Sequence, residues 1–282
     1  MTSTKSTIFI SDTHGDLDFF KAIGNLTHSI DGTVLLNGDI GSDYSLGPLM
    51  NVEAKADEIR KKYETGEIDE EAANKEISKL DEGIKKVVEA DEKEVSQIDK
   101  IFETYKNQVI YGLGNHDREG LVDFKNAKRI SNEVIEVNGY KIGHIDHYSA
   151  SFYNPDIQNH SEIKKQQKDG KLEEMLSNID ILMSHEIPSK KYGFIDERKK
   201  QTESETVSEE LVELVNKYKL SLFGGHVHEP IFDQEEDGRF YMRTCCGRSK
   251  NKAFYVTDHT DNTVYEIKYE NLMKWNELQN SN

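Results

Sequence analysis

Five short apolar runs in this chain are each followed at once by acidic, amide or imidazole side chains. A helix-like segment separates the first two runs, and this pattern predicts parallel strands joined by a helix. Because functional groups gather at the carboxyl ends of the strands in such sheets, we expect the polar groups to converge on one sheet edge. The groups are Asp12 and His14, Asp39, Asn115 and His116, His185, and His226 and His228.

A metal centre explains this convergence better than ordinary packing does. One histidine after one strand is most simply a structural residue, but polar groups at five strand ends form a pattern that packing does not require. Imidazole and carboxylate groups beside core strands are costly to bury unless they are paired or bound to a metal. The sequence therefore predicts a metal site at this edge of the sheet.

The candidate ligands divide into two sets that share one aspartate. A mixture of imidazole and carboxylate suits Mn, Fe, Zn, Co or Ni better than Mg or Ca, and we expect two Mn²⁺ ions first. Ligands at i and i+2 would share one side of an extended segment, and the glycines at 38, 114, 224 and 225 would let the backbone approach the metals closely. One set is Asp12, His14, Asp39 and His228, and the other is Asp39, Asn115, His185 and His226.

A pair of metal ions indicates hydrolysis of phosphoesters. Two ions about 3.5–4 Å apart lower the pKa of a shared water and hold the oxygens of an in-line displacement. Attack by the metal-bridging hydroxide would cleave a phosphomonoester or a phosphodiester. His116 is not needed as a ligand, so we expect it to face the substrate as a general acid or a stabiliser of the transition state. Asp117 or another acid would orient His116, and Arg118 would either bind a phosphate oxygen or pair with Glu119 at the surface.

A charged segment without proline lies between the second and third apolar runs. Its apolar residues recur at steps of three and four, which predicts amphipathic helices. We expect a helical hairpin of residues 50–64 and 69–106. The chain would then consist of a core, 1–50 and 107–282, with residues 51–106 inserted as a cap over the site or as an arm that joins two copies in a homodimer.

The other segments alternate between strand and helix signals. The dipeptide Asn138-Gly139 is a strong hairpin signal between strands at 133–137 and 140–146, and Asp16 is placed to cap the first helix. The further elements expected are a helix at 161–178, a strand at 180–183, a helix around 211–218, short antiparallel strands within 231–268 and a short terminal helix.

Two more groups of residues have alternative interpretations. Arg248, with Lys250 and Lys252, would form a local basic patch that binds substrate, although a charged hairpin edge is the simpler explanation. His147 follows a strand and is a candidate for the lining of the cleft, but we do not include it in the metal set.

The composition restricts the partners and the compartment. A formal net charge of -17 works against the binding of long nucleic acid, whose backbone is also negative. No run approaches the roughly 18 apolar residues of a membrane span, and the N-terminus lacks the pattern of a signal peptide. The two cysteines, Cys245 and Cys246, are adjacent and make no disulfide framework. We therefore expect a cytoplasmic protein that acts on a small phosphorylated substrate or nucleotide, away from membranes.

The order of these motifs resembles that of the calcineurin-like metallophosphoesterase superfamily. The resemblance covers the chain from residue 6 to residue 258. It implies an α/β fold, a four-layer αββα sandwich with a dinuclear centre, and it supports His116 as the catalytic histidine. The motifs read Asp12-Thr13-His14, Gly38-Asp39, Gly114-Asn115-His116-Asp117, Ser184-His185-Glu186 and Gly225-His226-Val227-His228.

The resemblance leaves the substrate open. DNA-repair exonucleases share these motifs, so a nuclease acting on DNA or RNA ends is an alternative, as are a protein phosphatase and a scaffold that keeps the fold without turnover. Scaffold relatives are expected to lack some ligands, and here every position is filled, which favours an enzyme. Two features depart from the family pattern, namely the long hairpin at 51–106 and the stretch at 243–251.

Overall fold

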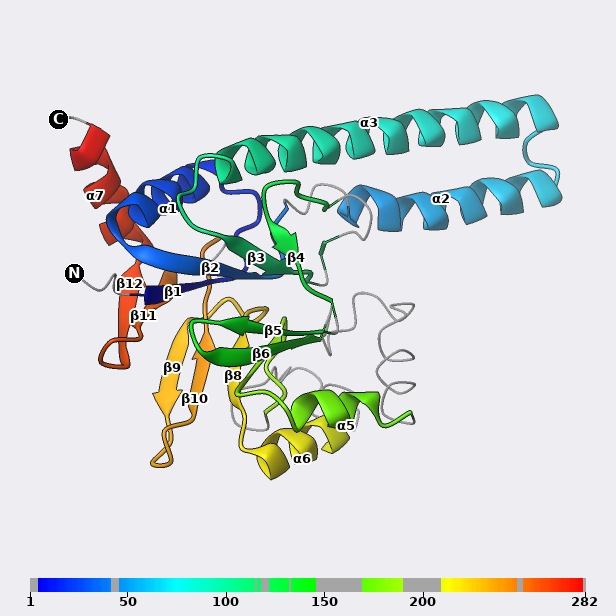
Figure 1. Ribbon diagram of the computed structural model, residues 1–282. Coiled ribbons are helices and arrows are strands. Elements are labelled where there is room, and N and C mark those ends of the chain that lie inside the picture. The colour runs from blue at the N-terminus through cyan, green and yellow to red at the C-terminus, as the bar shows by residue number, and fades with distance from the viewer. Residues whose placement is uncertain are drawn as a thin grey trace.

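Two six-stranded sheets form the centre of the protein (Figure 1). The computed structural model describes residues 5–41, 46–114, 116–117, 122–131, 133–145, 169–189, 209–247 and 251–280. The first sheet contains, in spatial order, β12 (Thr263–Lys268), β11 (Ala253–Asp258), β1 (Lys5–Ile10), β2 (Asp31–Asn37), β3 (Val109–Gly112) and β4 (Lys128–Arg129). The second contains, in spatial order, β5 (Val134–Val137), β6 (Tyr140–Ile145), β7 (Ile181–Ser184), β8 (Ser221–Gly224), β10 (Phe240–Arg243) and β9 (Ile231–Gln234).

Helices cover the outer face of each sheet, so the molecule has four layers (Figure 1). The first sheet carries α1 (Leu17–Ser29), the last turns of α3 (Glu70–Phe102) and α7 (Tyr269–Asn280). The second sheet carries α5 (Lys171–Leu176) and α6 (Glu209–Tyr218). This arrangement confirms the expected α/β class and the four-layer αββα sandwich.

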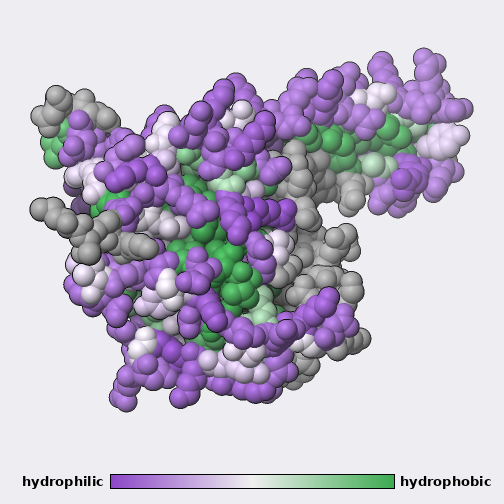
Figure 2. Space-filling view, in the orientation of Figure 1, coloured by the Kyte–Doolittle hydropathy of each residue, from purple (hydrophilic) through white to green (hydrophobic). Residues whose placement is uncertain are grey.

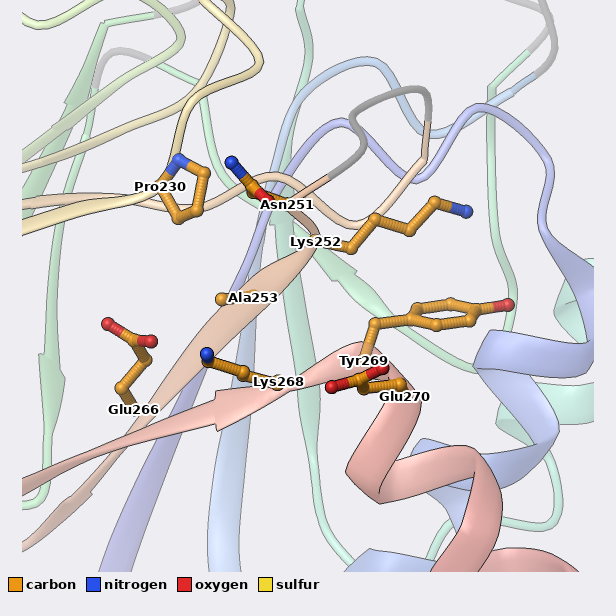
Figure 3. Close-up of a pocket in the computed structure, with 8 residues that line it drawn as sticks. All are labelled: Pro230, Asn251, Lys252, Ala253, Glu266, Lys268, Tyr269 and Glu270. Carbon is orange, nitrogen blue, oxygen red and sulfur yellow. The ribbon is translucent and has the colours of Figure 1, made fainter.

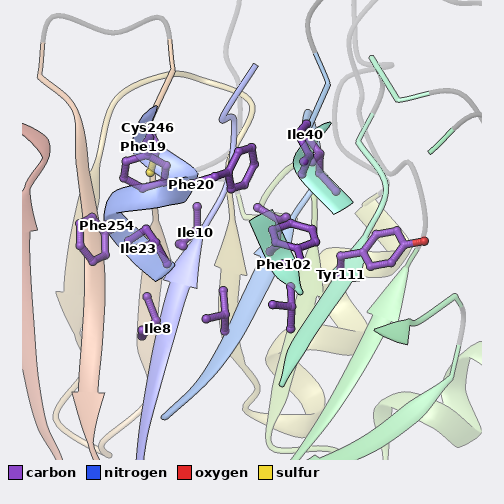
Figure 4. Packing of buried hydrophobic residues seen from close by; sticks show 14 of the residues in the cluster. Ile8, Ile10, Phe19, Phe20, Ile23, Ile40, Phe102, Tyr111, Cys246 and Phe254 are labelled. Atoms are coloured by element: carbon purple, nitrogen blue, oxygen red, sulfur yellow. The ribbon is translucent and has the colours of Figure 1, made fainter. Parts of the chain in front are cut away.

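Three apolar clusters fill the spaces between the four layers. Ile10 packs with Phe20 and Phe102 between the first sheet and its helices (Figure 4). Phe9 packs between the two sheets, where its ring centroid lies 5.0 Å from that of Phe223. Neighbouring residues of β1 enter different clusters because side chains alternate between the faces of a strand. The third cluster lies between the second sheet and the helices α5 and α6.

The strands β1 and β2 are parallel neighbours, as the strand–helix–strand pattern predicted, and β3 lies parallel to β2 on the other side. Ile8 lies opposite Val34, and Leu35 lies opposite Ile110. Between β1 and β2, the carboxylate of Asp16 accepts a hydrogen bond from the backbone N–H of Phe19 at 3.0 Å, which confirms the predicted helix cap. The carboxyl ends of the three strands therefore meet at one edge of the first sheet.

The turn at Asn138-Gly139 joins β5 to β6 as predicted. Both residues have positive φ angles, 52° and 89°, which is the conformation of a two-residue hairpin turn that suits the strand twist. The Asn138 side chain also donates to the backbone oxygen of Ser6 at 2.9 Å and to Oγ1 of Thr7 at 3.0 Å. The hairpin of the second sheet is thereby held against β1 of the first.

The helical hairpin consists of α2 (Leu46–Glu64) and α3, which extend away from the sandwich (Figure 1). The first helix begins four residues earlier than expected and the second ends at Phe102 rather than at 106. The last turns of α3 belong to the sandwich, because Ile98 and Phe102 are buried in the first cluster. Beyond them, the hydroxyl of Tyr105 donates to the backbone oxygen of Phe20 at 2.7 Å.

Some expected elements differ in detail. The two-residue strand β4 has no signal in the apolar pattern, and β10 pairs with β8 in parallel, whereas we expected only antiparallel strands in this region. Alternation marks a strand but says nothing of the direction of its neighbour. Of the helix expected at 161–178, α5 lies within the described part, and 161–168 lies outside it. Across the described ranges, no helix is long and apolar enough to cross a membrane.

Candidate metal centre

Four predicted ligands converge at the carboxyl ends of β1 and β2 of the first sheet and of β8 of the second. The expectation that the polar groups gather at the edge of a single sheet was therefore wrong, because the strand ends of two packed sheets meet here. Asp12, His14, Asp39 and His228 each offer one ligand atom, and these atoms all lie within 4.8 Å of one another. Nε2 of His14 lies 3.1 Å from Nε2 of His228, which in turn lies 3.4 Å from Oδ1 of Asp12. This group is the first ligand set expected from the sequence.

The described members of the second set lie directly beside the first. Nε2 of His185 is 3.2 Å from Oδ2 of Asp39, and the His185 and His226 rings are 5.2 Å apart between centroids. The backbone N–H of His226 donates to both carboxylate oxygens of Asp12, at 2.9 and 3.0 Å. Asp39 therefore contacts members of both sets, as a bridging ligand must. Asn115, the fourth member, lies outside the described residues.

Five of the predicted ligands have left-handed backbone conformations. Their φ angles are 50° at Asp12, 45° at His14, 50° at Asp39, 69° at His226 and 57° at His228. The expectation that the i and i+2 pairs lie on an extended segment was therefore wrong, because the chain turns sharply as soon as each strand ends. Positive φ strains a residue with a Cβ by about 1–3 kcal/mol, and such strain gathers at functional sites. Elsewhere among the described non-glycine residues it occurs at Asn138, Lys219 and Asn262.

Gly114 and Gly225 leave no room for a Cβ beside the predicted ligands. A Cβ on Gly225 would collide with the carboxylate of Asp12. A Cβ on Gly114 would collide with the backbone and carboxylate of Asp39 and lie 2.9 Å from Cε1 of His185. Neither position can carry a larger residue unless a ligand moves.

The electrostatics of the centre are those of buried, opposed charges. Burial raises the pKa of the Asp39 carboxyl, but His185 outweighs this and holds it well below its ordinary value. Burial lowers the pKa of His185, but Asp39 overrides burial and raises it to about 10. Burial, together with the charge of His185, lowers the pKa of His226 to about 3. Asp39 and His185 therefore favour each other's charged forms.

The donor set fits divalent transition metals. Of the two imidazole nitrogens that face each other at 3.1 Å, His14 Nε2 and His228 Nε2, at most one can carry a proton between them, so at least one lone pair points into the group. The carboxylates of Asp12 and Asp39 are buried beside them. Imidazole and carboxylate ligands without thiolates are the donors that manganese, iron and zinc accept.

His116 lies next to the ligands with part of its side chain accessible. Its backbone N–H donates to Oδ1 of Asp39 at 2.9 Å, and its Nε2 lies 4.0 Å from Oδ2 of the same residue. Its ring centroid is 5.9 Å from that of His14, and 26% of its side chain is exposed. This position allows contact with a molecule bound at the metals.

Asp117 has hydrogen-bond partners other than the expected one. Its carboxylate accepts from the backbone N–H groups of Gly114 at 2.8 Å, Ile40 at 2.9 Å and Gly41 at 3.3 Å. Burial, followed by the charge of Asp39, raises the pKa of Asp117 to about 6. These contacts join the loops after β2 and β3, so Asp117 holds His116 in place through the backbone.

Further polar residues support the ligands but have no distinctive sequence signal. The hydroxyl of Ser11 donates to Oδ2 of Asp12 at 2.5 Å and receives a hydrogen bond from Oγ1 of Thr244 at 2.8 Å. The side chain of Asn37 donates to the backbone oxygens of Ser184 at 2.8 Å and Phe223 at 3.1 Å, which joins the two sheets beneath the centre. Only their position at strand ends could have suggested them.

A cavity of about 540 Å³ opens where β11 and β12 meet α7 (Figure 3). Pro230, two residues beyond His228, lies on its wall, and Lys252 and Glu270 line it as well. Lys252 Nζ lies 3.8 Å from Oδ2 of Asp16 and 4.3 Å from the centre of a tyrosine ring. The expected basic patch therefore has acidic neighbours at Lys252. Three other predicted site residues, Arg118, His147 and Arg248, lie outside the described part of the chain.

Comparisons with known proteins show similarity in structure only. No protein-family model and no curated protein matches the sequence. A dimetal phosphatase from Danio rerio matches in structure with a TM-score of 0.56, at 10% identity, over 94% of this chain and 96% of that protein. This match confirms the fold that the resemblance to calcineurin-like metallophosphoesterases implied.

Two further structures match at lower TM-scores. An archaeal phosphodiesterase matches with a TM-score of 0.41, at 14% identity, over 93% of this chain and 99% of that one. A 5'-nucleotidase precursor from Thermus thermophilus matches with a TM-score of 0.41, at 11% identity, over 94% of this chain and 54% of that one.

Proposed function

We propose that this chain is a metal-dependent hydrolase that cleaves phosphomonoesters or phosphodiesters. The observation that carries the proposal is the convergence of four ligand atoms, from Asp12, His14, Asp39 and His228, within 4.8 Å of one another at the edge of a sandwich. The shared fold with a dimetal phosphatase supports it. Left-handed backbone at the same four residues supports it further, because such strain is retained where a function requires the geometry.

Two ions, Mn²⁺ first among the candidates, would occupy the two ligand sets that share Asp39. When bound, such a pair lowers the pKa of a shared water and binds phosphate oxygens. Asp12, His14 and His228 would complete one set, and His185 with His226 and Asn115 the other. Arg118 and Arg248 are proposed to bind the phosphate group of the substrate.

His116 is proposed as the general acid. Its Nδ1 is buried, so Nε2 is the nitrogen from which a proton can reach a leaving oxygen. The hydrogen bond from its backbone N–H to Asp39 holds the backbone of His116 beside the proposed ligands. Asp117 is proposed to act in catalysis by holding this loop against the loop after β2.

The test is hydrolysis of synthetic esters by metal-free protein to which Mn²⁺ is added back. We expect cleavage of a phosphomonoester or a phosphodiester above the level of an Asp39→Asn control, in proportion to bound metal. Nucleotides and single-stranded oligonucleotides are assayed in parallel, and cleavage of oligonucleotides alone would make the protein a nuclease. Turnover equal to that of the Asp39→Asn control on every substrate would indicate that the protein is a scaffold that keeps the fold without catalysis.

The hairpin of α2 and α3 is proposed to join two copies of the chain. Near its tip, Tyr63 and Ile77 are exposed at 48% and 41%, although both are large apolar residues. Figure 2 shows apolar side chains along the hairpin between the hydrophilic outer sides of the two helices. An exposed apolar surface of this kind is typical of an interaction site.

We also propose a reducing compartment, the cytoplasm, for this protein. Cys245 and Cys246 are both buried. Two adjacent cysteines make no disulfide framework, and this fits a compartment in which thiols stay reduced.

A further inference from the structure

Glu186 is a buried carboxylate that directly follows a predicted ligand, His185. One of its oxygens, Oε2, lies 3.9 Å from Nε2 of His226, a ligand of the same proposed set. The Glu186 side chain is 1% exposed and the His226 side chain 10%. A carboxylate buried this deeply keeps its charge only in an environment that compensates it. Because Glu186 lies beside the imidazole of His226, its carboxylate affects the electrostatic environment of that ring.

The segment that carries Glu186 is held in place by the ends of β7 and β8 in the second sheet. The hydroxyl of Ser184 donates to the backbone oxygen of Glu186 at 2.7 Å, and the backbone N–H of Gly225 donates to the oxygen of His185 at 2.7 Å. A Cβ on Gly224 would lie 2.5 Å from Cγ1 of Ile187, so this segment packs directly against the end of β8. The loop with Glu186 and the loop with His226 thus form one unit.

We propose that Glu186 is a positioning residue that orients His226 for metal binding. A neutral imidazole has one N–H and one lone pair, and a nearby carboxylate favours the form in which the N–H faces it. With Nε2–H directed at Glu186, the lone pair of His226 lies on Nδ1 and is available to a metal. At 3.9 Å the contact exceeds hydrogen-bond length, so its effect is electrostatic. The inference rests on the proposed metal centre and names a residue outside its ligand sets.

The test compares Glu186→Gln with a control that removes an equal charge nearby. Glu229 is exposed and follows His228 directly, so Glu229→Gln alters the charge around the centre without altering the buried contact. Metal-free, full-length proteins are titrated with Mn²⁺ in a calorimeter. The wild type and Glu229→Gln should show two binding events. Glu186→Gln should weaken one of the two by about 10–100-fold, the usual effect of removing a carboxylate behind a ligating histidine.

Two further measurements separate positioning from a merely structural role. The conservative variant Glu186→Asp keeps the charge and should recover part of the lost affinity. The ¹⁵N spectrum of the imidazole should show protonated Nε2 on His226 in the metal-free wild type, and a smaller share of that form in Glu186→Gln. Melting of the metal-free proteins should be unchanged.

Three results would overturn the inference. These are two unchanged binding events in Glu186→Gln, an equal weakening of both events together with a lower melting temperature of the metal-free protein, and a wild type that binds no metal. A wild type that binds two ions but cleaves no phosphoester refutes the proposed function and leaves the role of Glu186 standing. The two proposals therefore fail separately.

Discussion

His116 lies beside the proposed metal ligands without belonging to either ligand set, so its substitution should separate catalysis from metal binding. We expect His116→Asn to lower kcat by about 10²–10⁴-fold, the usual contribution of a general acid. Because the backbone N–H that contacts Asp39 is retained, the metal content should not change. Steady-state kinetics and metal analysis on the same preparations test this. Loss of bound metal in parallel with activity would contradict the assigned role.

His185 links metal binding to pH. The pKa of its imidazole is lowered by burial but raised to about 10 by the stronger effect of Asp39, so it is protonated at neutral pH without metal. A metal can bind this nitrogen only after the proton leaves. Affinity for the metal of this set should therefore rise by about tenfold per pH unit between about pH 6 and pH 9.

Calorimetry in buffers of different protonation enthalpy measures this linkage directly. We expect about one proton to be released when the set that contains His185 is filled. The dependence of metal affinity on pH should disappear in His185→Asn, because asparagine has no proton to release. An affinity that does not change with pH in the wild type would show that the imidazole is already neutral.

At the scale of elements, the loops after the strands are set by sterics as much as by hydrogen bonds. A Cβ on Gly225 would collide with the Asp12 carboxylate, whereas a Cβ on Gly83, within α3, would meet no atom within 4 Å. We expect Gly225→Ala to reduce the free energy of unfolding by about 1–3 kcal/mol and to weaken metal binding. Gly83→Ala should increase the free energy of unfolding by about 0.5–1 kcal/mol, because alanine loses less backbone freedom than glycine when a helix forms.

Denaturant unfolding of the metal-free proteins compares the two substitutions under the same conditions. Both add one methyl group to the chain, so each serves as the control for the other. If Gly225→Ala were as stable as Gly83→Ala, the loops of Asp12 and His226 would have to move apart at little cost. The close packing of these loops would then be no constraint on the site.

The strand ends were predictable at this scale, and the conformation of the loops was not. Asp12 and His14 follow a buried run, so their place at the edge of a parallel sheet follows from the pattern alone. The left-handed conformation at both residues depends on contacts with the loop after β2, where the backbone N–H groups of Asp12 and His14 donate to the oxygens of Gly38 and Asp39. These partners are more than twenty residues away in the sequence, and no local pattern includes them.

At the scale of the whole molecule, the base of the helical hairpin packs against the sandwich next to the site. A Cβ on Gly15, the residue after His14, would collide with the carboxylate of Glu94 from α3. Ile98 and Phe102 of the same helix are part of the first apolar cluster. Removal of the whole segment 51–106 would therefore unfold part of the sandwich, and a test of association must alter the tip alone.

Substitution of Tyr63 and Ile77 by serine should convert a dimer into a monomer. These residues are exposed near the tip, so the free energy of unfolding of the single chain should change little. Size-exclusion chromatography with light scattering should give twice the chain mass for the wild type and the chain mass for the double variant. Lys79→Ser, an exposed substitution on the same helix, is the control and should stay dimeric. A monomeric wild type would show that the hairpin is not a dimerisation arm.

The sequence by itself determined the parallel strand–helix–strand unit, the helical hairpin and the polar residues at the strand ends, because strand periodicity, helix periodicity and chain order are local properties. Only the tertiary structure decided which other polar residues support them. Ser11 meets Thr244 and Asn37 meets Ser184 across the fold, and Glu186 faces His226 between two loops. Such contacts join segments 40 to more than 230 residues apart. They arise from the packing of two sheets, which no periodic pattern of one segment records.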